Sequence, residues 1–324
     1  MHSIQYLQEK FKNALDAQEF SYDPPELYQP IGYTLALGGK RLRPVLMLMG
    51  CDLFEGDIEK AIPAAIGLEI FHNFTLLHDD IMDKAPIRRG KPSVYKKWNT
   101  NIAILSGDTM FAIAYNYVAE TEKELLPDVL KVFTQTAKEV CEGQQYDLNY
   151  EVQAHVSLND YTKMIRLKTA VLFAASLKIG AIIAGADAND IQNLYLFGEN
   201  TGMAFQLRDD LLDVYGIEEK FGKKTGGDIL ANKKTFLYLK AFELAEGSTR
   251  DKLNSCFIIN KYNRETKIKE VIEIYNQLGV KASAENEMDK YYQKAMEHLD
   301  KVKVEKKRKQ ELIRLAKTIA IRDY

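Results

Sequence analysis

Apolar residues recur at helical spacing along nearly the whole chain, and no segment alternates in strand fashion for long. The pattern breaks at proline and glycine clusters, notably residues 21–25 and Gly38-Gly39, where we expect helices to begin or end. Pro44 and Pro63 suit the first turn of a helix, so we expect helices to begin there. The pattern predicts an all-α fold.

No linker is long or polar enough to divide the 324 residues, so we expect a single domain over residues 1–324. Ser157 and Asp160 form a capping-box pattern ahead of a helix that we expect over residues 158–185. The most apolar window, residues 170–186, is interrupted by Lys178 and falls short of a membrane span. We therefore expect no transmembrane segment.

Two copies of one acidic signature stand 130 residues apart, at 79–83 (DDIMD) and at 209–213 (DDLLD). At 3.6 residues per turn, the first and last aspartates of each motif share a helix face. If the two helices faced each other, they would form an oxygen-only site for a hard cation such as Mg²⁺. One copy alone would more often be a solvated acidic turn. Two copies in apolar segments favour a metal site.

Basic residues gather in loops beside these two motifs. They lie in residues 38–44, 88–90, 223–228 and 232–234. Arginine binds phosphate oxygens through two parallel bonds, whereas lysine acts as a mobile point charge. Any one of these cations alone would be interpreted as solvated surface. Together they indicate a metal-bound polyanion, and two separate cation sets indicate two diphosphates.

Composition excludes some classes of function. The net charge of −2 argues against a broadly basic nucleic-acid binder. The three cysteines have no CxxC spacing, which is typical of a reducing cytosol, and the N-terminus has no apolar signal-peptide core. We therefore expect a cytoplasmic protein.

In chain order, the motifs resemble those of the trans-isoprenyl diphosphate synthases, which include the farnesyl, geranylgeranyl and longer polyprenyl diphosphate synthases. The matching segments are GGKRLRP at 38–44, HDDIMD at 78–83, RRG at 88–90, LRDDLLDVYG at 207–216 and GKKTGGD at 222–228. The resemblance runs from about Tyr28 to Lys240. It implies a mostly antiparallel isoprenoid synthase-type helical bundle around a deep central cavity, usually as a homodimer.

The resemblance also implies the reaction. An allylic diphosphate of C5 to C15 ionises with the help of three Mg²⁺ ions, Mn²⁺ being an alternative, and isopentenyl diphosphate attacks the carbocation. Loss of a proton then gives an all-trans product one C5 unit longer. The implied metal ligands are Asp79, Asp83 and Asp209, with Asp80, Asp210 and Asp213 in supporting positions.

The remaining implied site residues form two groups. The allylic diphosphate would be held by Arg88, Lys168, Thr169, Gln206, Lys223 and Lys233, and isopentenyl diphosphate by Lys40, Arg43, His72 and Arg89. Thr169 and Gln206, with the Lys168 main chain, match positions that turn oxygen dipoles toward the carbocation. Gln144 and Asp147 match a pattern that supports the metals indirectly. Without the resemblance, a lone helical histidine such as His72 would be interpreted as structural.

The resemblance implies that the residues four and five positions before the first motif help to set product length. Here they are Thr75 and Phe74, a pattern that resembles the geranylgeranyl (C20) enzymes. Thr75 lies on the stripe of Asp79 and Asp83, but Phe74 lies about 100° aside. We rank a C20 product first, then C15, then a longer chain.

Three other functions compete with this one. A terpene cyclase usually mixes residue types in its second metal motif and does not need the cations Lys40, Arg43 and Arg89. A non-catalytic partner subunit of a synthase typically lacks one or both acidic motifs. A structural ion-binding protein leaves the arginine pair and the 223–228 loop unexplained. The sequence favours the enzyme.

We predict that Phe74→Ala lengthens the product, because it removes the aromatic side chain that would block chain growth. Mass analysis of the products of the variant and the parent chain checks this. An unchanged product distribution would refute the assignment of Phe74 to the floor of the tunnel.

Overall fold

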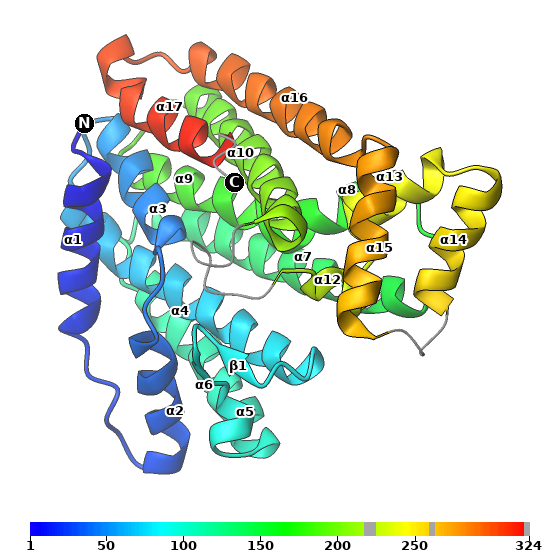
Figure 1. Ribbon diagram of the computed structural model, residues 1–324. Coiled ribbons are helices and arrows are strands. Elements are labelled where there is room, and N and C mark those ends of the chain that lie inside the picture. Colours follow the sequence, from blue (N-terminus) through cyan, green and yellow to red (C-terminus); the bar gives the residue numbers. More distant parts are fainter. Residues whose placement is uncertain (217–224, 259–262, 321–324) are drawn as a thin grey trace. The chain divides into compact units, whose positions relative to one another are not determined.

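The structure is a computed structural model, and it describes residues 1–216, 225–258 and 263–320. The described residues fold almost entirely into helices (Figure 1). Within them, two short antiparallel strands form the only sheet: β1 (Ile87–Arg88) pairs with β2 (Lys91–Pro92) inside the basic loop. The predicted all-α class is confirmed.

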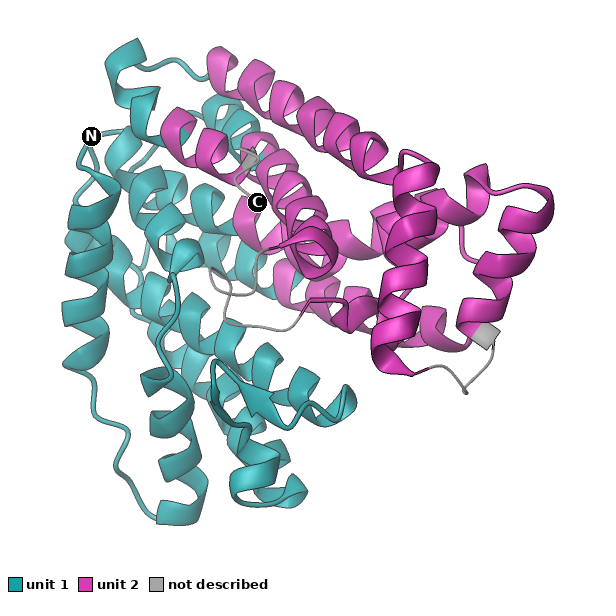
Figure 2. Cartoon of the chain, in the orientation of Figure 1, with its two compact units in different colours: residues 1–135, 175–195, 302–312 teal, residues 136–174, 196–301, 313–324 magenta. Residues whose placement is uncertain are grey.

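The chain divides into two compact units, shown in Figure 2, and each is described by itself. Residues 1–135, 175–195 and 302–312 form the first unit, and residues 136–174, 196–301 and 313–324 belong to the second. The first contains α1 (Ile4–Asp16), α2 (Pro25–Ala36), α3 (Leu42–Leu53), α4 (Ile58–Met82), α5 (Val94–Lys97) and α6 (Thr100–Ala119). The second contains α8 (Leu158–Ile165), the π-helical turn η1 (Arg166–Ala170), α12 (Gly227–Leu230), α13 (Phe236–Leu244), α14 (Gly247–Ile258), α15 (Arg264–Gln277) and α16 (Val280–Lys301). The unit boundaries fall within α7 (Leu126–Val152), α9 (Val171–Ile183), α10 (Ala188–Tyr215) and α17 (Lys306–Ala320). The single domain remains a prediction.

The core of the first unit forms where α4 packs against α3 and α6. All three helices are rich in apolar residues, and the side chains of Leu68 and Phe71 on α4 are fully buried. Two glycines allow the main chains of α3 and α9 to approach closely. A Cβ atom at Gly180 would lie 2.0 Å from the Met47 carbonyl oxygen, which no side chain tolerates. This packing holds α4, and with it the first acidic motif, in the centre of the unit.

The core of the second unit places the π-helical turn η1 against two other helices. A Cβ atom at Gly143 on α7 would lie 2.3 Å from the main-chain nitrogen of Lys168. A Cβ atom at Gly202 on α10 would lie 2.6 Å from the Cα atom of Ala170. Both glycines are therefore required by close packing rather than by backbone flexibility. They bring α7 and α10 directly against the turn that carries Lys168 and Thr169.

Three predicted helix boundaries need correction, and one cap is confirmed. The α3 helix begins at Leu42, two residues before the expected start at Pro44. The α4 helix begins at Ile58 rather than at Pro63, because the Asp57 side chain accepts from the Glu59 amide and caps an earlier turn. The predicted helix over 158–185 is interrupted by the π-helical turn at 166–170 and ends at Ile183. The capping box of Ser157 and Asp160 is confirmed, with both reciprocal hydrogen bonds present.

Among the described residues, α6 is the one helix long and apolar enough to cross a membrane, with a mean hydropathy of 1.2 and 33% of its residues buried. One such helix is weak evidence, because core helices of soluble proteins meet the same criterion.

Candidate active site

The first acidic motif ends helix α4 and separates its aspartates by burial. Asp80 is 3% exposed, whereas Asp79 is partly exposed and Asp83 is exposed. Arg88 donates from Nε and Nη2 to the Asp80 Oδ1 atom at 3.0 and 2.5 Å. Asp80 is thus held by an arginine from the β1–β2 hairpin. The two accessible aspartates, Asp79 and Asp83, are the two that the sequence predicted as metal ligands.

A buried ion pair fixes the GGKRLRP turn ahead of α3. Arg41 adopts a left-handed backbone (φ 49°) and directs its guanidinium inward, where it donates to the Glu69 carboxylate and to the Leu35 carbonyl oxygen. Glu69 is 1% exposed and also accepts from Asn73 Nδ2 at 2.7 Å. Our sequence reasoning missed Arg41 and Glu69. A single carboxylate within the apolar stretch of α4 was the available signal.

His72, Arg43 and Arg89, predicted to bind one diphosphate, lie together in the first unit. Arg43 Nη1 lies 3.0 Å from His72 Nε2. Because a guanidinium only donates, Nε2 must accept, and the imidazole is therefore neutral. Burial, followed by the charges of Arg43, Arg89, Arg41 and Arg88, lowers the pKa of His72 well below its usual range. These positive charges around one neutral ring favour a polyanionic ligand.

Arg89 closes this group against the glycine turn. Its backbone is left-handed (φ 51°), and its guanidinium donates to the Gly38 carbonyl oxygen. Gly39 has a φ of 127°, which side chains rarely adopt, and a Cβ atom there would lie 2.8 Å from the Arg89 Cζ atom, so a substitution would displace the guanidinium. Lys40 follows in the same turn and is exposed. The motifs at 38–44 and 88–90, far apart in the sequence, therefore form one site.

Phe74 belongs to a group of aromatic side chains from α4 and α6. Its ring centroid lies 5.7 Å from that of Phe71, 5.3 Å from Phe111 and 4.8 Å from His78. Thr75 donates from its hydroxyl to the His72 carbonyl oxygen at 2.8 Å. The side chain of Phe74 is half-buried, one turn before the acidic motif.

In the second acidic motif, Asp210 is buried at the meeting point of three donors. It accepts from the Tyr161 hydroxyl at 2.6 Å, from Gln206 Nε2 at 3.0 Å and from the Phe236 amide at 3.4 Å. Burial raises the pKa of Asp210 to about 7, opposed by the hydrogen bonds from Tyr161 and Gln206. Asp209, the predicted metal ligand, is exposed.

Asp228 joins this motif from the GGD segment. Its amide donates to Asp213 Oδ2 at 2.9 Å, and burial together with the charges of Asp213 and Asp210 raises the pKa of Asp228. The positive charge of Lys233 lowers the pKa of Asp228, so the Lys233 ammonium lies near that carboxylate. We missed Asp228 as a site residue. Lys223 lies outside the described residues.

The candidate metal ligands in the two acidic motifs suit a hard cation. They are all carboxylate oxygens. Burial is the main cause of the raised pKa values of Asp210 and Asp228, and the charges of neighbouring aspartates add to it; a bound cation would offset both effects. Within the described residues, no three His, Cys, Asp or Glu side chains are gathered as a complete metal site.

The π-helical turn carries two further predicted residues. Lys168 Nζ lies 2.6 Å from Asp147 Oδ2, and the Thr169 hydroxyl donates to Gln206 Oε1 at 2.9 Å. Gln144, the neighbour of this pair on α7, is 8% exposed. The second unit thus brings Lys168, Thr169, Gln206 and Asp210 into one connected group. Tyr161, which completes it, was also missed.

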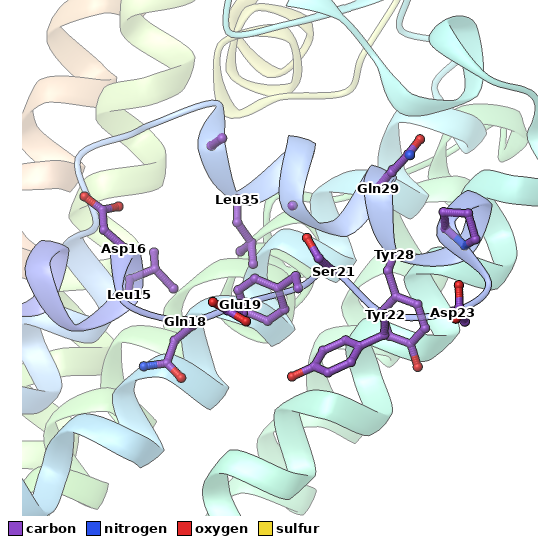
Figure 3. A pocket seen from close by; sticks show the side chains of 14 residues that line it. Leu15, Asp16, Gln18, Glu19, Ser21, Tyr22, Asp23, Tyr28, Gln29 and Leu35 are labelled. Carbon is purple, nitrogen blue, oxygen red and sulfur yellow. The ribbon is translucent and has the colours of Figure 1, made fainter.

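Two open cavities lie away from these residues. One of about 950 Å³ lies between the end of α1 and α2, where Tyr22 and Tyr28 pack edge to face at 5.2 Å (Figure 3). The other, of about 770 Å³, lies in the second unit and is lined by Lys234, Tyr238 and Phe242 among others. Neither is lined by a predicted site residue.

Comparison with known proteins agrees with the motifs. Residues 24–275 match the family model described as polyprenyl synthetase. The chain is 41% identical to a geranylgeranyl diphosphate synthase of Methanosarcina mazei over 223 residues, 68% of each protein. It is 37% identical to that of Sulfolobus acidocaldarius over 286 residues, which cover 87% of this chain and 86% of the relative.

A solved structure of similar extent gives the same result. The geranylgeranyl pyrophosphate synthetase of Pyrococcus horikoshii superposes with a TM-score of 0.91 at 36% identity, covering 99% of this chain and 98% of that one. The fold, the order of the motifs and the extent of the match lead to one conclusion. The chain belongs to the polyprenyl synthetase family.

Proposed function

We propose that this protein is a trans-prenyltransferase that condenses isopentenyl diphosphate with an allylic diphosphate of C5 to C15, giving mainly geranylgeranyl diphosphate. One observation carries the proposal: the first unit joins Arg43, His72 and Arg89 into a cationic group, and the carboxylates of the first acidic motif follow His72 on the same helix. Two diphosphates held in different ways are what a condensation of this kind requires.

We propose Mg²⁺, or Mn²⁺ in its place, as the cofactor, with Asp79, Asp83 and Asp209 as its ligands. The exposure of these three carboxylates and the burial of Asp80 and Asp210 support that division. When bound, the metal neutralises the allylic diphosphate and stabilises it as a leaving group. We propose that Asp80, Asp210 and Asp213 occupy supporting positions beside these ligands. Around the same allylic diphosphate we propose four cationic side chains, which are Arg88, Lys168, Lys223 and Lys233.

The bonds change as follows. The C–O bond of the allylic diphosphate breaks, and its electron pair leaves with the diphosphate. The C=C electrons of isopentenyl diphosphate, which is held by Lys40, Arg43, His72 and Arg89, form the new C–C bond to the allylic cation. The departing diphosphate accepts the proton that is lost. Thr169 and Gln206 turn oxygen dipoles to the cation, and the surrounding apolar residues exclude water.

The relatives named above as geranylgeranyl diphosphate synthases support the C20 product. The packing of Phe74 against Phe71 and Phe111 also supports it, because a wall of three aromatic rings is suited to stop a growing chain. Farnesyl diphosphate or a longer product is the alternative. A non-catalytic partner subunit is disfavoured by two intact acidic motifs. We further propose one domain, a homodimer and a cytoplasmic location.

Incubating the protein with Mg²⁺, isopentenyl diphosphate and each allylic diphosphate from C5 to C15 tests the function. Mass analysis is expected to show a dominant C20 product. A C15 or longer product would keep the reaction and overturn the product length. Absence of elongation with every starter would refute the enzyme and favour the partner subunit.

Asp79→Ala and Asp209→Ala should each lower kcat by on the order of a thousandfold, about 4 kcal/mol of lost transition-state stabilisation. Each variant removes a ligand of the metal that draws off the leaving group. Steady-state kinetics at saturating Mg²⁺ checks this, with Asp251→Ala, an exposed carboxylate on α14, as the control. Near wild-type turnover in either variant would contradict the two-motif mechanism.

Glu69→Gln should raise the KM for isopentenyl diphosphate by about tenfold, roughly 1.4 kcal/mol, with little change in the KM for the allylic substrate. Without its carboxylate partner, the buried Arg41 no longer holds the turn that carries Lys40 and Arg43. The matched control is Glu59→Gln, whose carboxylate pairs with Lys10 at the exposed start of the same helix. Equal changes in both KM values would show that Glu69 has no selective role.

A further inference from the structure

Four side chains of the second unit form a directed chain of hydrogen bonds. Tyr161 on α8 donates to Asp210, Gln206 donates to the same carboxylate, and Thr169 on η1 donates to Gln206. The three distances are 2.6, 3.0 and 2.9 Å. Tyr161, Asp210 and Thr169 are buried and Gln206 is partly buried, so water competes little for these bonds.

Asp210 determines which way the Gln206 amide faces. Both carboxylate oxygens receive donors: Oδ1 from Gln206, and Oδ2 from Tyr161 and the Phe236 amide. While Asp210 is ionised, the reversed amide would place its carbonyl oxygen against a carboxylate oxygen, which is repulsive. The Nε2 group must therefore face Asp210, and the Oε1 atom faces Thr169.

The orientation of Gln206 in turn sets that of the Thr169 hydroxyl. A hydroxyl has one proton and two lone pairs, and the Thr169 proton is committed to Gln206 Oε1. Among the described residues, the Thr169 hydroxyl has no other hydrogen bond. To any other neighbour it offers lone pairs only. Such an oxygen attracts a developing positive charge and repels an anion.

We propose that Tyr161 and Asp210 are positioning residues that fix the polarity of the Gln206–Thr169 pair, so that Thr169 turns lone pairs rather than its proton toward the allylic carbocation. The inference rests on the proposed function and adds to it the device that keeps the dipole aligned before ionisation. Tyr161 holds the carboxylate in place without touching the substrate. An aligned dipole stabilises the transition state without having to reorganise.

The test compares the binding of two probes by calorimetry in the presence of Mg²⁺. One is an allylic thiolodiphosphate, which does not ionise, and the other is a diphosphate analogue with a tertiary ammonium at the position of the cationic carbon. The ratio of the two affinities measures how well the site stabilises positive charge. Tyr161→Phe should lower this preference for the ammonium probe by about tenfold, as is typical for a supporting hydrogen bond. The thiolodiphosphate affinity and the KM for isopentenyl diphosphate should change little.

Tyr275→Phe is the matched control, because Tyr275 is a second buried tyrosine of the same unit, at 2% exposure, and lies outside the hydrogen-bond chain. The preference of the Tyr275→Phe variant for the ammonium probe should equal that of the wild type. If Tyr161→Phe also keeps the wild-type preference, the proposal is wrong. If the wild-type protein itself neither elongates a substrate nor prefers the ammonium probe, the proposed function fails instead.

A second set of variants tests whether Tyr161 acts through Thr169. Thr169→Val should lose the preference and Thr169→Ser should keep it, because serine retains the hydroxyl. In the Thr169→Val background, Tyr161→Phe should have no further effect, whereas independent losses that multiply would overturn the proposal. Should Tyr161→Phe not fold, Gln206→Met, which removes the amide at similar length, must reproduce the loss.

Discussion

A buried carboxylate must be paired, and the geometry of each candidate site depends on that requirement. A lone carboxylate in the interior costs several kcal/mol, so its partners are held firmly in place. In the first unit, Glu69 holds Arg41 and Asp80 holds Arg88. Each pair fixes one loop: the turn before α3, or the hairpin after α4. The other arginines of those loops, Arg43 and Arg89, are positioned as a consequence.

The second unit meets the same requirement in a different way. Within the part of the chain that the structure describes, Asp210 has no cationic hydrogen-bond partner and is held by a tyrosine, a glutamine and a backbone amide. Burial raises the pKa of Asp210 to about 7 although these neutral donors act to lower it, and burial with the charges of Asp213 and Asp210 raises the pKa of Asp228. Among the described residues, the carboxylates of Asp209, Asp210, Asp213 and Asp228 gather near Lys233, and this accumulation of negative charge favours a bound cation. The first unit concentrates positive charge around His72, whereas the second unit concentrates negative charge around Asp210 and Asp228.

The sequence indicated the exposed residues of the candidate sites more readily than the buried residues that hold them in place. The i, i+4 spacing identified Asp79 and Asp83, and motif order placed Arg43, His72 and Arg89 in one group, which the structure brings together. Residue type alone does not distinguish Arg41 from Arg43; the family resemblance singled out Arg43, and the left-handed backbone that turns Arg41 inward became visible only in the structure. Tyr161 was missed because its partner Asp210 is 49 residues away and only packing brings them together.

The interruption of the helix predicted over 158–185 shows where local pattern ceases to be sufficient. Residues 166–170 carry no proline or glycine, so nothing in their composition predicts a π-helical turn. The adjacent helices instead provide a physical cause. With no side chain at Gly143 and Gly202, the helices α7 and α10 press directly on the main chain at Lys168 and Ala170. A regular helix would rotate Lys168 and Thr169 relative to their partners Asp147 and Gln206. The same close packing that disrupts the helix therefore aligns the residues proposed to meet the substrate.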